Sequence, residues 1–221
     1  MDFPQTPGIH DVEIKGQDGR ARRYTVSVPG AAAERRPLVL VLHYAGTPTR
    51  FYGRPLIEYL VGPALSPHAP VLVAPESAGG PWHSEANEAF VMHLLMRASA
   101  AYAIDDGRRV VCGYSMGAIG TWHFLMHYPE HFSAALPIAG FPNQELSCPR
   151  PVHAFHSARD ELFALAKLEG IVTALAAIGA DISLTTADVN GHYDVNGYAP
   201  VLAQAVPWLR AVWARQDAAA A

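Results

Sequence analysis

Gly113-Tyr114-Ser115-Met116-Gly117 is the stretch around which the rest of the chain is organised. The run before it, residues 109–112, is short and apolar and contains two valines, which predicts a buried strand. The segment after it, residues 118–127, has the pattern of a helix that Pro129 ends. Strand, G-x-S-x-G and helix together are typical of a nucleophile elbow, a strained turn that lifts a serine hydroxyl off the end of a sheet. The flanking glycines have a steric reason, because a Cβ at either one would collide with the neighbouring strand or helix.

The alternative interpretation of this stretch is an ordinary strand-to-helix loop that happens to contain a serine. The pentapeptide by itself is common enough to occur by chance, so its weight comes from the strand–turn–helix context. A hydrolytic elbow also requires an acid and a histidine later in the chain.

Apolar strands alternate with helical patterns along the whole chain, which predicts a mostly parallel sheet with helices on both faces. The first two strands, joined by a turn at residues 17–19, form an antiparallel hairpin at the edge of an eight-stranded sheet. Strands are expected at residues 9–15, 22–28, 37–43, 71–75, 109–112, 132–140, 151–156 and 181–186. Helices are expected within residues 51–65 and at 84–103, 118–127, 162–178 and 198–213.

Length and composition indicate one domain that spans residues 1–221, with a frayed tail at 214–221. The net charge is −4 and charged residues make up 16% of the chain, which argues against nucleic acid and anionic membranes as partners. The two cysteines lack the spacing of a zinc site, so we expect no metal. Neither a signal peptide nor a run of transmembrane length is visible, which predicts a soluble, cytoplasmic protein.

An acid and a histidine follow the elbow in the order that a serine hydrolase of this architecture requires. Asp160 comes after the strand at residues 151–156, and His192 comes after the last strand. Both lie in loops at the carboxyl ends of strands, where sites in open α/β sheets gather. A serine hydroxyl becomes a strong nucleophile only when a base takes its proton and a third group holds that base. We therefore predict a triad of Ser115, Asp160 and His192.

Other assignments of the acid stay open at this point. Asp160 has the alternative role of capping the helix expected from Leu162, since aspartate is a favoured N-cap residue. Glu161 is a competing acid, and Asp188 and Asp194 lie close enough to His192 in sequence to orient it instead. Most of the eleven histidines are expected on the surface or in loops, and His156 is expected in the core or behind the site.

Hydrolysis also needs donors for the negative oxygen of the tetrahedral intermediate. One donor is expected to be the backbone N–H of Met116, at the start of the helix that follows the nucleophile. The other is expected from the loop after the strand at residues 37–43, from Tyr44 or Ala45. For that loop, the alternative is an ordinary strand-to-helix turn.

The chain resembles the α/β-hydrolase superfamily, and within it the small serine esterases of the phospholipase/carboxylesterase, dienelactone hydrolase and polyhydroxybutyrate-depolymerase/feruloyl-esterase group. The resemblance covers His43 to His192 and is carried by the elbow, Thr121-Trp122, Tyr128-Pro129-Glu130 and Pro137-Ile138-Ala139-Gly140. The family's strand-3 loop reads His-Gly-x and its third position donates the oxyanion amide. On this chain that position is Ala45.

Two positions depart from the family pattern or extend it. Tyr44 replaces the glycine of His-Gly-x, which makes its side chain a candidate for substrate contact. Trp82 falls where such relatives carry a tryptophan, and it is expected either to line the substrate site or to pack in the core. Many relatives insert a helical lid between the strands at 132–140 and 151–156, but the ten residues 141–150 are too few to form one. The resemblance thus implies a minimal lid or none.

These observations together predict a carboxylesterase that hydrolyses small or accessible soluble esters through an acyl-enzyme, with no metal or organic cofactor. A peptidase or thioesterase would use the same triad, since the machinery also cleaves amides and thioesters. A ligand-binding protein with a hydrolase fold and no catalysis is the alternative of a different class. The sequence does not fix the natural ester or the oligomeric state.

Overall fold

The computed structural model describes residues 3–15, 19–30, 35–47, 49–144 and 146–220. Its eight strands form one sheet in the order β1-β2-β4-β3-β5-β6-β7-β8. The strands are β1 (Gly8–Lys15), β2 (Ala21–Val28), β3 (Arg36–Leu42), β4 (Val71–Pro75), β5 (Ile104–Tyr114), β6 (Ala134–Ile138), β7 (Val152–Ser157) and β8 (Ile182–Ala187). β2 pairs antiparallel with both β1 and β4, and every other pair is parallel. The predicted mostly parallel sheet is confirmed.

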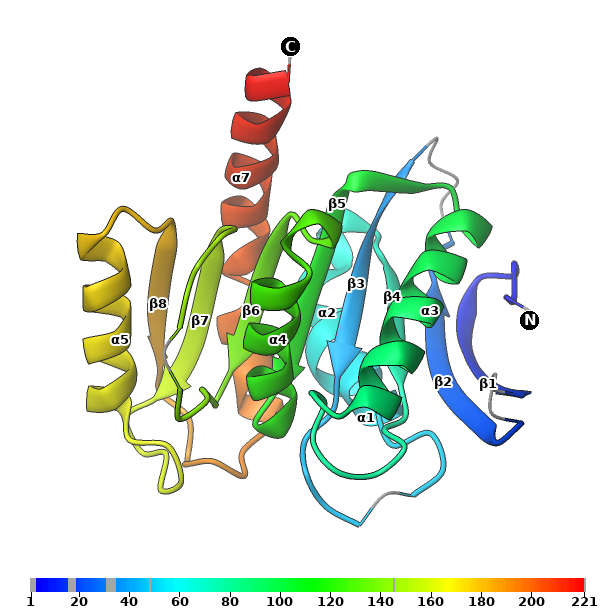
Figure 1. The fold of residues 1–221 in the computed structure, drawn as a ribbon, viewed down its shortest axis with the longest axis horizontal. Coiled ribbons are helices and arrows are strands. Elements are labelled where there is room, and N and C mark those ends of the chain that lie inside the picture. Colours follow the sequence, from blue (N-terminus) through cyan, green and yellow to red (C-terminus); the bar gives the residue numbers. More distant parts are fainter. Residues whose placement is uncertain (1–2, 16–18, 31–34, 48, 145, 221) are drawn as a thin grey trace.

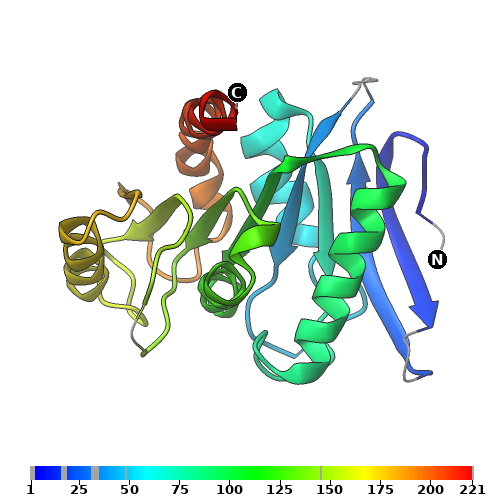
Figure 2. The same ribbon diagram turned by 45° about the horizontal axis from the view of Figure 1, so that its top comes forward.

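Helices cover both faces of this sheet (Figures 1 and 2). One face carries α3 (Glu85–Ala101), α4 (Met116–His127) and α5 (Leu165–Ala177). The other carries α1 (Arg54–Leu56), the π-helical turn η1 (Ile57–Val61), α2 (Gly62–Leu65), α6 (Ala199–Leu202) and α7 (Ala205–Ala220). Short 3₁₀ turns lie at η2 (Ser66–His68), η3 (Pro129–His131) and η4 (Asn196–Tyr198).

The apolar run of β3 explains why the sheet is buried on both faces. Leu38, Leu40 and Leu42 point into the core under α3 and α4, while Val39 and Val41 point into the core under α2 and α7. None of the five is more than 2% exposed. Because successive side chains of a strand face opposite sides, a run without polar alternation requires helices on both faces.

The starts of β5 and α5 differ from the sequence prediction by several residues. β5 begins at Ile104, five residues before the predicted strand, because Ile104 pairs with Arg36 before the register shifts. α5 begins at Leu165 and not near Leu162, because residues 160–164 form a loop with its own hydrogen bonds. The turn predicted at residues 17–19 lies largely outside the described residues.

The expectation of a frayed tail at 214–221 is wrong for the described residues, since α7 continues to Ala220. Alanine has the highest intrinsic helix propensity, so an alanine-rich end favours continuation of the helix. Side chains of this last part also contact the domain: Arg215 pairs with Asp181 at 2.7 Å, and the Gln216 amide donates to the Ser133 carbonyl at 3.0 Å. These contacts join the end of the helix to the N-terminal edges of β6 and β8.

The connection between β6 and β7 decides how exposed the neighbouring site is. Its described residues, 139–144 and 146–151, contain no helix. The predicted fold with a minimal lid therefore holds for this part of the chain. In the described residues, no helix is both long enough and apolar enough to cross a membrane.

His153 in β7 gives the fold a dependence on pH. Its ring is stacked on Phe155 and meets Trp208, and burial lowers its pKa from 6.5 to about 4. Below pH 6.5 the unfolded chain takes up a proton at this residue that the folded chain does not, so the folded state loses stability as the pH falls toward 4. We expect His153→Leu to remove this dependence.

Urea unfolding of both proteins at pH 7.5 and pH 4.5 measures the effect. The free energy of unfolding should fall between these pH values by about 2 kcal/mol more in the wild type than in the variant. Groups common to both proteins cancel in this difference. Equal losses in the two proteins would contradict the role of His153.

Candidate active site

Ser115 lies in a sharp turn between β5 and α4. Its backbone has φ 56° and ψ −115°, a conformation that is strained for a residue with a side chain. The Ser115 N–H donates to the carbonyl of Ile138 at 2.9 Å, which ties the turn to the end of the neighbouring strand β6. α4 begins at the next residue, so the hydroxyl stands at a helix N-terminus. This is the geometry expected of the elbow.

The glycines on either side of Ser115 allow its neighbours to approach closely. A Cβ on Gly113 would lie 2.2 Å from the carbonyl oxygen of Gly117. A Cβ on Gly117 would lie 2.0 Å from the carbonyl oxygen of Leu42 at the end of β3. Both contacts are with backbone atoms, which cannot rotate away as a flexible side chain does. The sequence predicted that a Cβ at either glycine would collide with a neighbouring element, and the structure identifies the atom that it would meet at each position.

Gly117→Ala should destabilise the fold by about 3 kcal/mol or more, because α4 must move away from β3. Gly170→Ala is the matched control, since Gly170 lies in α5 with no atom within 4 Å of its added Cβ. That change should stabilise the protein by about 0.5–1 kcal/mol through helix propensity. Urea denaturation measures both, and a Gly117→Ala protein as stable as the wild type would refute the close approach.

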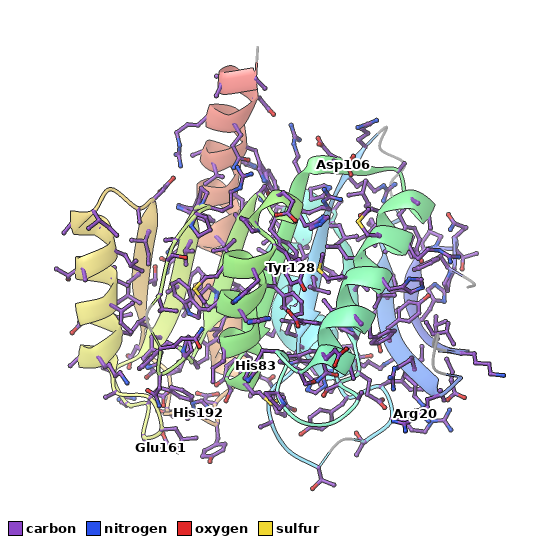
Figure 3. The ribbon with its side chains drawn as sticks, in the orientation of Figure 1. Arg20, His83, Asp106, Tyr128, Glu161 and His192 are labelled. Carbon is purple, nitrogen blue, oxygen red and sulfur yellow. The ribbon has the colours of Figure 1, made fainter. Side chains whose placement is uncertain are left out.

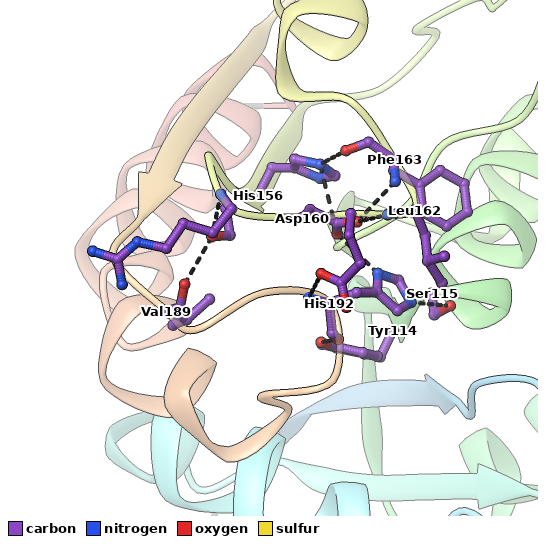
Figure 4. Close-up of polar contacts among 11 residues, drawn as sticks. Tyr114, Ser115, His156, Asp160, Leu162, Phe163, Val189 and His192 are labelled. Carbon is purple, nitrogen blue, oxygen red and sulfur yellow. Dashed lines mark hydrogen bonds and ion pairs between the residues drawn. The ribbon is translucent and has the colours of Figure 1, made fainter.

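Two hydrogen bonds connect three side chains from the ends of different strands (Figure 4). Ser115 Oγ lies 2.8 Å from His192 Nε2, and His192 Nδ1 lies 2.8 Å from Asp160 Oδ2. Ser115 follows β5, Asp160 follows β7, and His192 follows β8. His192 is 3% exposed and Asp160 is 9% exposed, whereas Ser115 is half-buried. The arrangement lets the imidazole accept the serine proton while the carboxylate holds its other nitrogen.

The Asp160 carboxylate is held from both sides. Its Oδ1 accepts hydrogen bonds from the backbone N–H groups of Leu162 at 2.9 Å and Phe163 at 2.8 Å, while Oδ2 faces His192. Because α5 begins only at Leu165, these bonds fix a loop and do not cap that helix. Because both backbone amides bind Oδ1, Oδ2 is left free to bind the imidazole of His192.

The other candidate acids contact different groups. Glu161 Oε2 accepts from the backbone N–H of His192 at 2.8 Å, and Figure 3 labels the two residues close together at one edge of the molecule. Asp188 pairs with Arg159 at 2.9 Å. Asp194 accepts the backbone N–H groups of Asn190 and Gly197, which closes the loop that carries His192. Of the four acids, Asp160 is the one that contacts the imidazole of His192.

No protein-family model matches the chain. An uncharacterized secreted protein of Arthroderma benhamiae is 42% identical over 40 residues, which are 18% of this chain and 4% of that protein.

Solved structures match far more of the chain. A thermostable esterase superposes with a TM-score of 0.72 and 23% identity over 91% of this chain, which spans 62% of the esterase's length. FphF of Staphylococcus aureus, a fluorophosphonate-binding serine hydrolase, has a TM-score of 0.72 and 11% identity over 92% of this chain and 98% of its own. A ferulic acid esterase has a TM-score of 0.70 and 16% identity over 94% and 99%. The chain has the α/β-hydrolase fold.

In an α/β-hydrolase fold the acid and the histidine follow the nucleophile along the chain, and Asp160 and His192 follow Ser115 in that order. The structure gives contacts at the site to three further residues, of which the sequence had marked Glu161 as a competing acid and His156 as a residue of the core or behind the site. Glu161 binds the amide of His192, as described above. The Tyr114 hydroxyl donates to the carbonyl of His192, and burial raises the pKa of this tyrosine. Both ends of the His192 residue are therefore tied to the body of the protein.

His156 is the third of these positions and lies behind the acid. It is fully buried, and its Nε2 lies 2.6 Å from the carbonyl oxygen of Phe163 and 3.7 Å from Asp160 Oδ2. The sequence predicted a core residue or one behind the site. His156 is both. It is buried in the core, and its hydrogen bond to Phe163 holds the loop whose amides bind Asp160.

The predicted oxyanion donors lie at two adjoining places in the α/β-hydrolase fold. Met116 is the first residue of α4, so its backbone N–H has no carbonyl within the helix to bind. Ala45 lies in the loop just after β3, and the close approach of Gly117 to Leu42 brings that strand end against the elbow. Ala45 is exposed and Met116 is half-buried.

The two aromatic residues considered for substrate contact differ in burial. Tyr44 is half-buried, and its ring meets those of Tyr52 at 5.2 Å and Tyr114 at 6.2 Å. Trp82 is 1% exposed and packs against Gly120 of α4, while its indole N–H donates to the carbonyl of His43 at 2.9 Å. For Trp82, this placement favours core packing over a pocket wall.

Proposed function

We propose that the protein is a serine carboxylic-ester hydrolase, of carboxylesterase type, that works through an acyl-enzyme. One observation carries the proposal: Ser115, His192 and Asp160 are connected by two 2.8 Å hydrogen bonds, and Ser115 stands on an elbow from which α4 begins. The structural neighbours described as esterases support the ester as the substrate class.

In the proposed reaction Ser115 Oγ attacks the ester carbonyl while His192 Nε2 takes its proton. The tetrahedral oxyanion is held by the amides of Met116 and Ala45, and the Asp160 carboxylate stabilises the imidazolium. His192 then gives the proton to the departing alcohol, which leaves the acyl group on Ser115. A water molecule then attacks this acyl-enzyme while His192 takes its proton. The bond between the acyl group and Ser115 Oγ breaks, the acid leaves, and His192 returns the proton to Ser115 Oγ. These steps require neither a metal nor an organic cofactor.

The surroundings of the triad support small or accessible esters as substrates. The described residues between β6 and β7 contain no helix that would cover the site. Leu162 and Tyr193, each within two residues of a triad member, are 56% and 75% exposed. A polar, enclosed site would select its substrates by hydrogen bonding. The exposed side chains of Leu162 and Tyr193 instead offer apolar surface to the acyl or alcohol group of an ester. Tyr44 is proposed as a further substrate contact.

Hydrolysis of p-nitrophenyl acetate and butyrate, combined with labelling by a fluorophosphonate probe, tests the proposal. We expect turnover of both esters and one probe adduct per chain, located on the Ser115 peptide by mass spectrometry. A protein that the probe labels but that cleaves only thioesters or peptides would be a thioesterase or peptidase. A protein that neither reacts with the probe nor cleaves any of these substrates would refute catalysis and favour a ligand-binding role. The cytoplasmic location stays a prediction, which cell fractionation tests.

A further inference from the structure

The loop that supplies the second oxyanion donor is held by a buried histidine. His43, the residue that follows β3, is 1% exposed. Its Nε2 lies 3.0 Å from the backbone N–H of Ser77, and its Nδ1 lies 2.8 Å from the carbonyl oxygen of Tyr44. Because an N–H can only donate, Nε2 accepts and the ring proton sits on Nδ1, from which it is donated to Tyr44. Burial lowers the pKa of His43, which favours this neutral form.

Asn87 in α3 holds Ser77, whose backbone N–H sets the tautomer of His43. Its side chain is fully buried and accepts from the Ala78 N–H at 2.7 Å, while its amide lies 3.1 Å from Ser77 Oγ and 2.9 Å from the Pro81 carbonyl. The loop at residues 77–81 is thus fixed to α3 by one side chain. Its Ser77 N–H is thereby aimed at His43 Nε2.

The peptide that carries the Tyr44 carbonyl also carries the Ala45 N–H. In a trans peptide these two groups point in opposite directions, and no cis peptide occurs in the described residues. β3 lies between β4 and β5 in the sheet. The His43 ring is bonded to Ser77 in the loop after β4, so the Tyr44 carbonyl turns toward the β4 side. The Ala45 N–H then turns toward the β5 side, where Ser115 stands.

We propose that His43 is a positioning residue that aims the Ala45 N–H at the oxyanion, and that Asn87 acts through Ser77 to keep His43 in the required tautomer. This inference rests on the proposed function, because it assigns a cause to one of its two oxyanion donors. It also accounts for a tyrosine at position 44. A residue with a side chain suffices there, since the peptide direction is set by the hydrogen bond and the φ of Tyr44 is not positive.

His43→Leu, His43→Gln and His43→Asn test the inference with p-nitrophenyl butyrate. Leucine lacks the donor, and glutamine places its amide one carbon too far from the Tyr44 carbonyl. Asparagine places its amide nitrogen close to the position of Nδ1. We expect kcat to fall about 10- to 100-fold in the first two variants, with KM within about threefold. His43→Asn should keep kcat within about fivefold of the wild type, even though its Ser77 contact is lost.

Two further measurements separate positioning from general damage. A change at the triad would move the pH profile of kcat/KM, whereas misdirection of one oxyanion donor would not, so the profile should keep its midpoints in all three variants. His153→Leu, which removes another buried histidine, should keep kcat within about twofold. Wild-type kcat in His43→Leu or His43→Gln, or an equal loss in His43→Asn, would overturn the inference while the ester hydrolase stands. A wild-type protein inert to both ester and fluorophosphonate would refute the proposed function itself and the inference with it.

Discussion

Replacement of Ser115 by alanine is expected to lower kcat/KM for p-nitrophenyl butyrate by about 10⁴- to 10⁶-fold. In the proposed reaction the Ser115 Oγ forms the bond to the acyl group, and the hydroxyl of the adjacent Tyr114 is bound to the carbonyl of His192. Any remaining turnover would come from water attack in a site that still holds the oxyanion. The change removes only the Oγ atom, and the hydrogen bond from the Ser115 N–H to Ile138 is unaffected.

Ser66→Ala is the matched control for this measurement. Ser66 is exposed, its hydroxyl donates to the carbonyl of Pro63, and it lies outside the elbow and its neighbouring loops. Its kcat/KM should stay within about twofold of the wild type. Fluorophosphonate labelling gives a second readout, because the alanine variant should form no adduct. If Ser115→Ala retained wild-type turnover, the nucleophile would be a different residue.

The parts of the fold and site that follow from the sequence depend on local patterns and on parallel topology. The run around Leu40 predicts a strand that is buried on both faces, and it is one. The elbow motif is also local, since Gly113, Ser115 and Gly117 fall within five residues, although the carbonyl that excludes a Cβ at Gly117 belongs to Leu42 on β3. Asp160 and His192 were predicted together because the carboxyl ends of parallel strands meet at one edge of a sheet. No side-chain geometry was needed for that step.

The remaining features depend on contacts between residues far apart in the sequence. Glu161 was a competing acid in the sequence, and in the structure it binds the backbone amide of His192 and not its imidazole. The Tyr114 hydroxyl contacts a carbonyl 78 residues away. His43 and Asn87 both contact Ser77, and no spacing rule links the three. Such hydrogen bonds depend on how loops close over the sheet edge, which propensity and periodicity do not specify.

Asp160→Asn is expected to lower kcat about 10⁴-fold, and the hydrogen bonds of the carboxylate give the reason. Oδ1 accepts two backbone N–H groups, from Leu162 and Phe163, so the oxygen of an asparagine must take that place. The NH₂ group then faces His192 Nδ1, where it can only donate. His192 is forced into the tautomer with its proton on Nε2, and that nitrogen can no longer accept the proton of Ser115. The side chain at position 160 therefore stays bound to its loop, while His192 loses its function as the base.

Asp188→Asn and Asp194→Asn are the controls that give this experiment its meaning. Asp188 pairs with Arg159 on the surface, and Asp194 binds backbone N–H groups at Asn190 and Gly197. We expect kcat within about threefold of the wild type for the first and within about tenfold for the second, because Asp194 supports the loop of His192. Circular dichroism of each variant establishes that it is folded. If Asp194→Asn lost activity by orders of magnitude while Asp160→Asn kept it, the acid that orients His192 during turnover would be Asp194. His192 would then have to change partners when substrate binds.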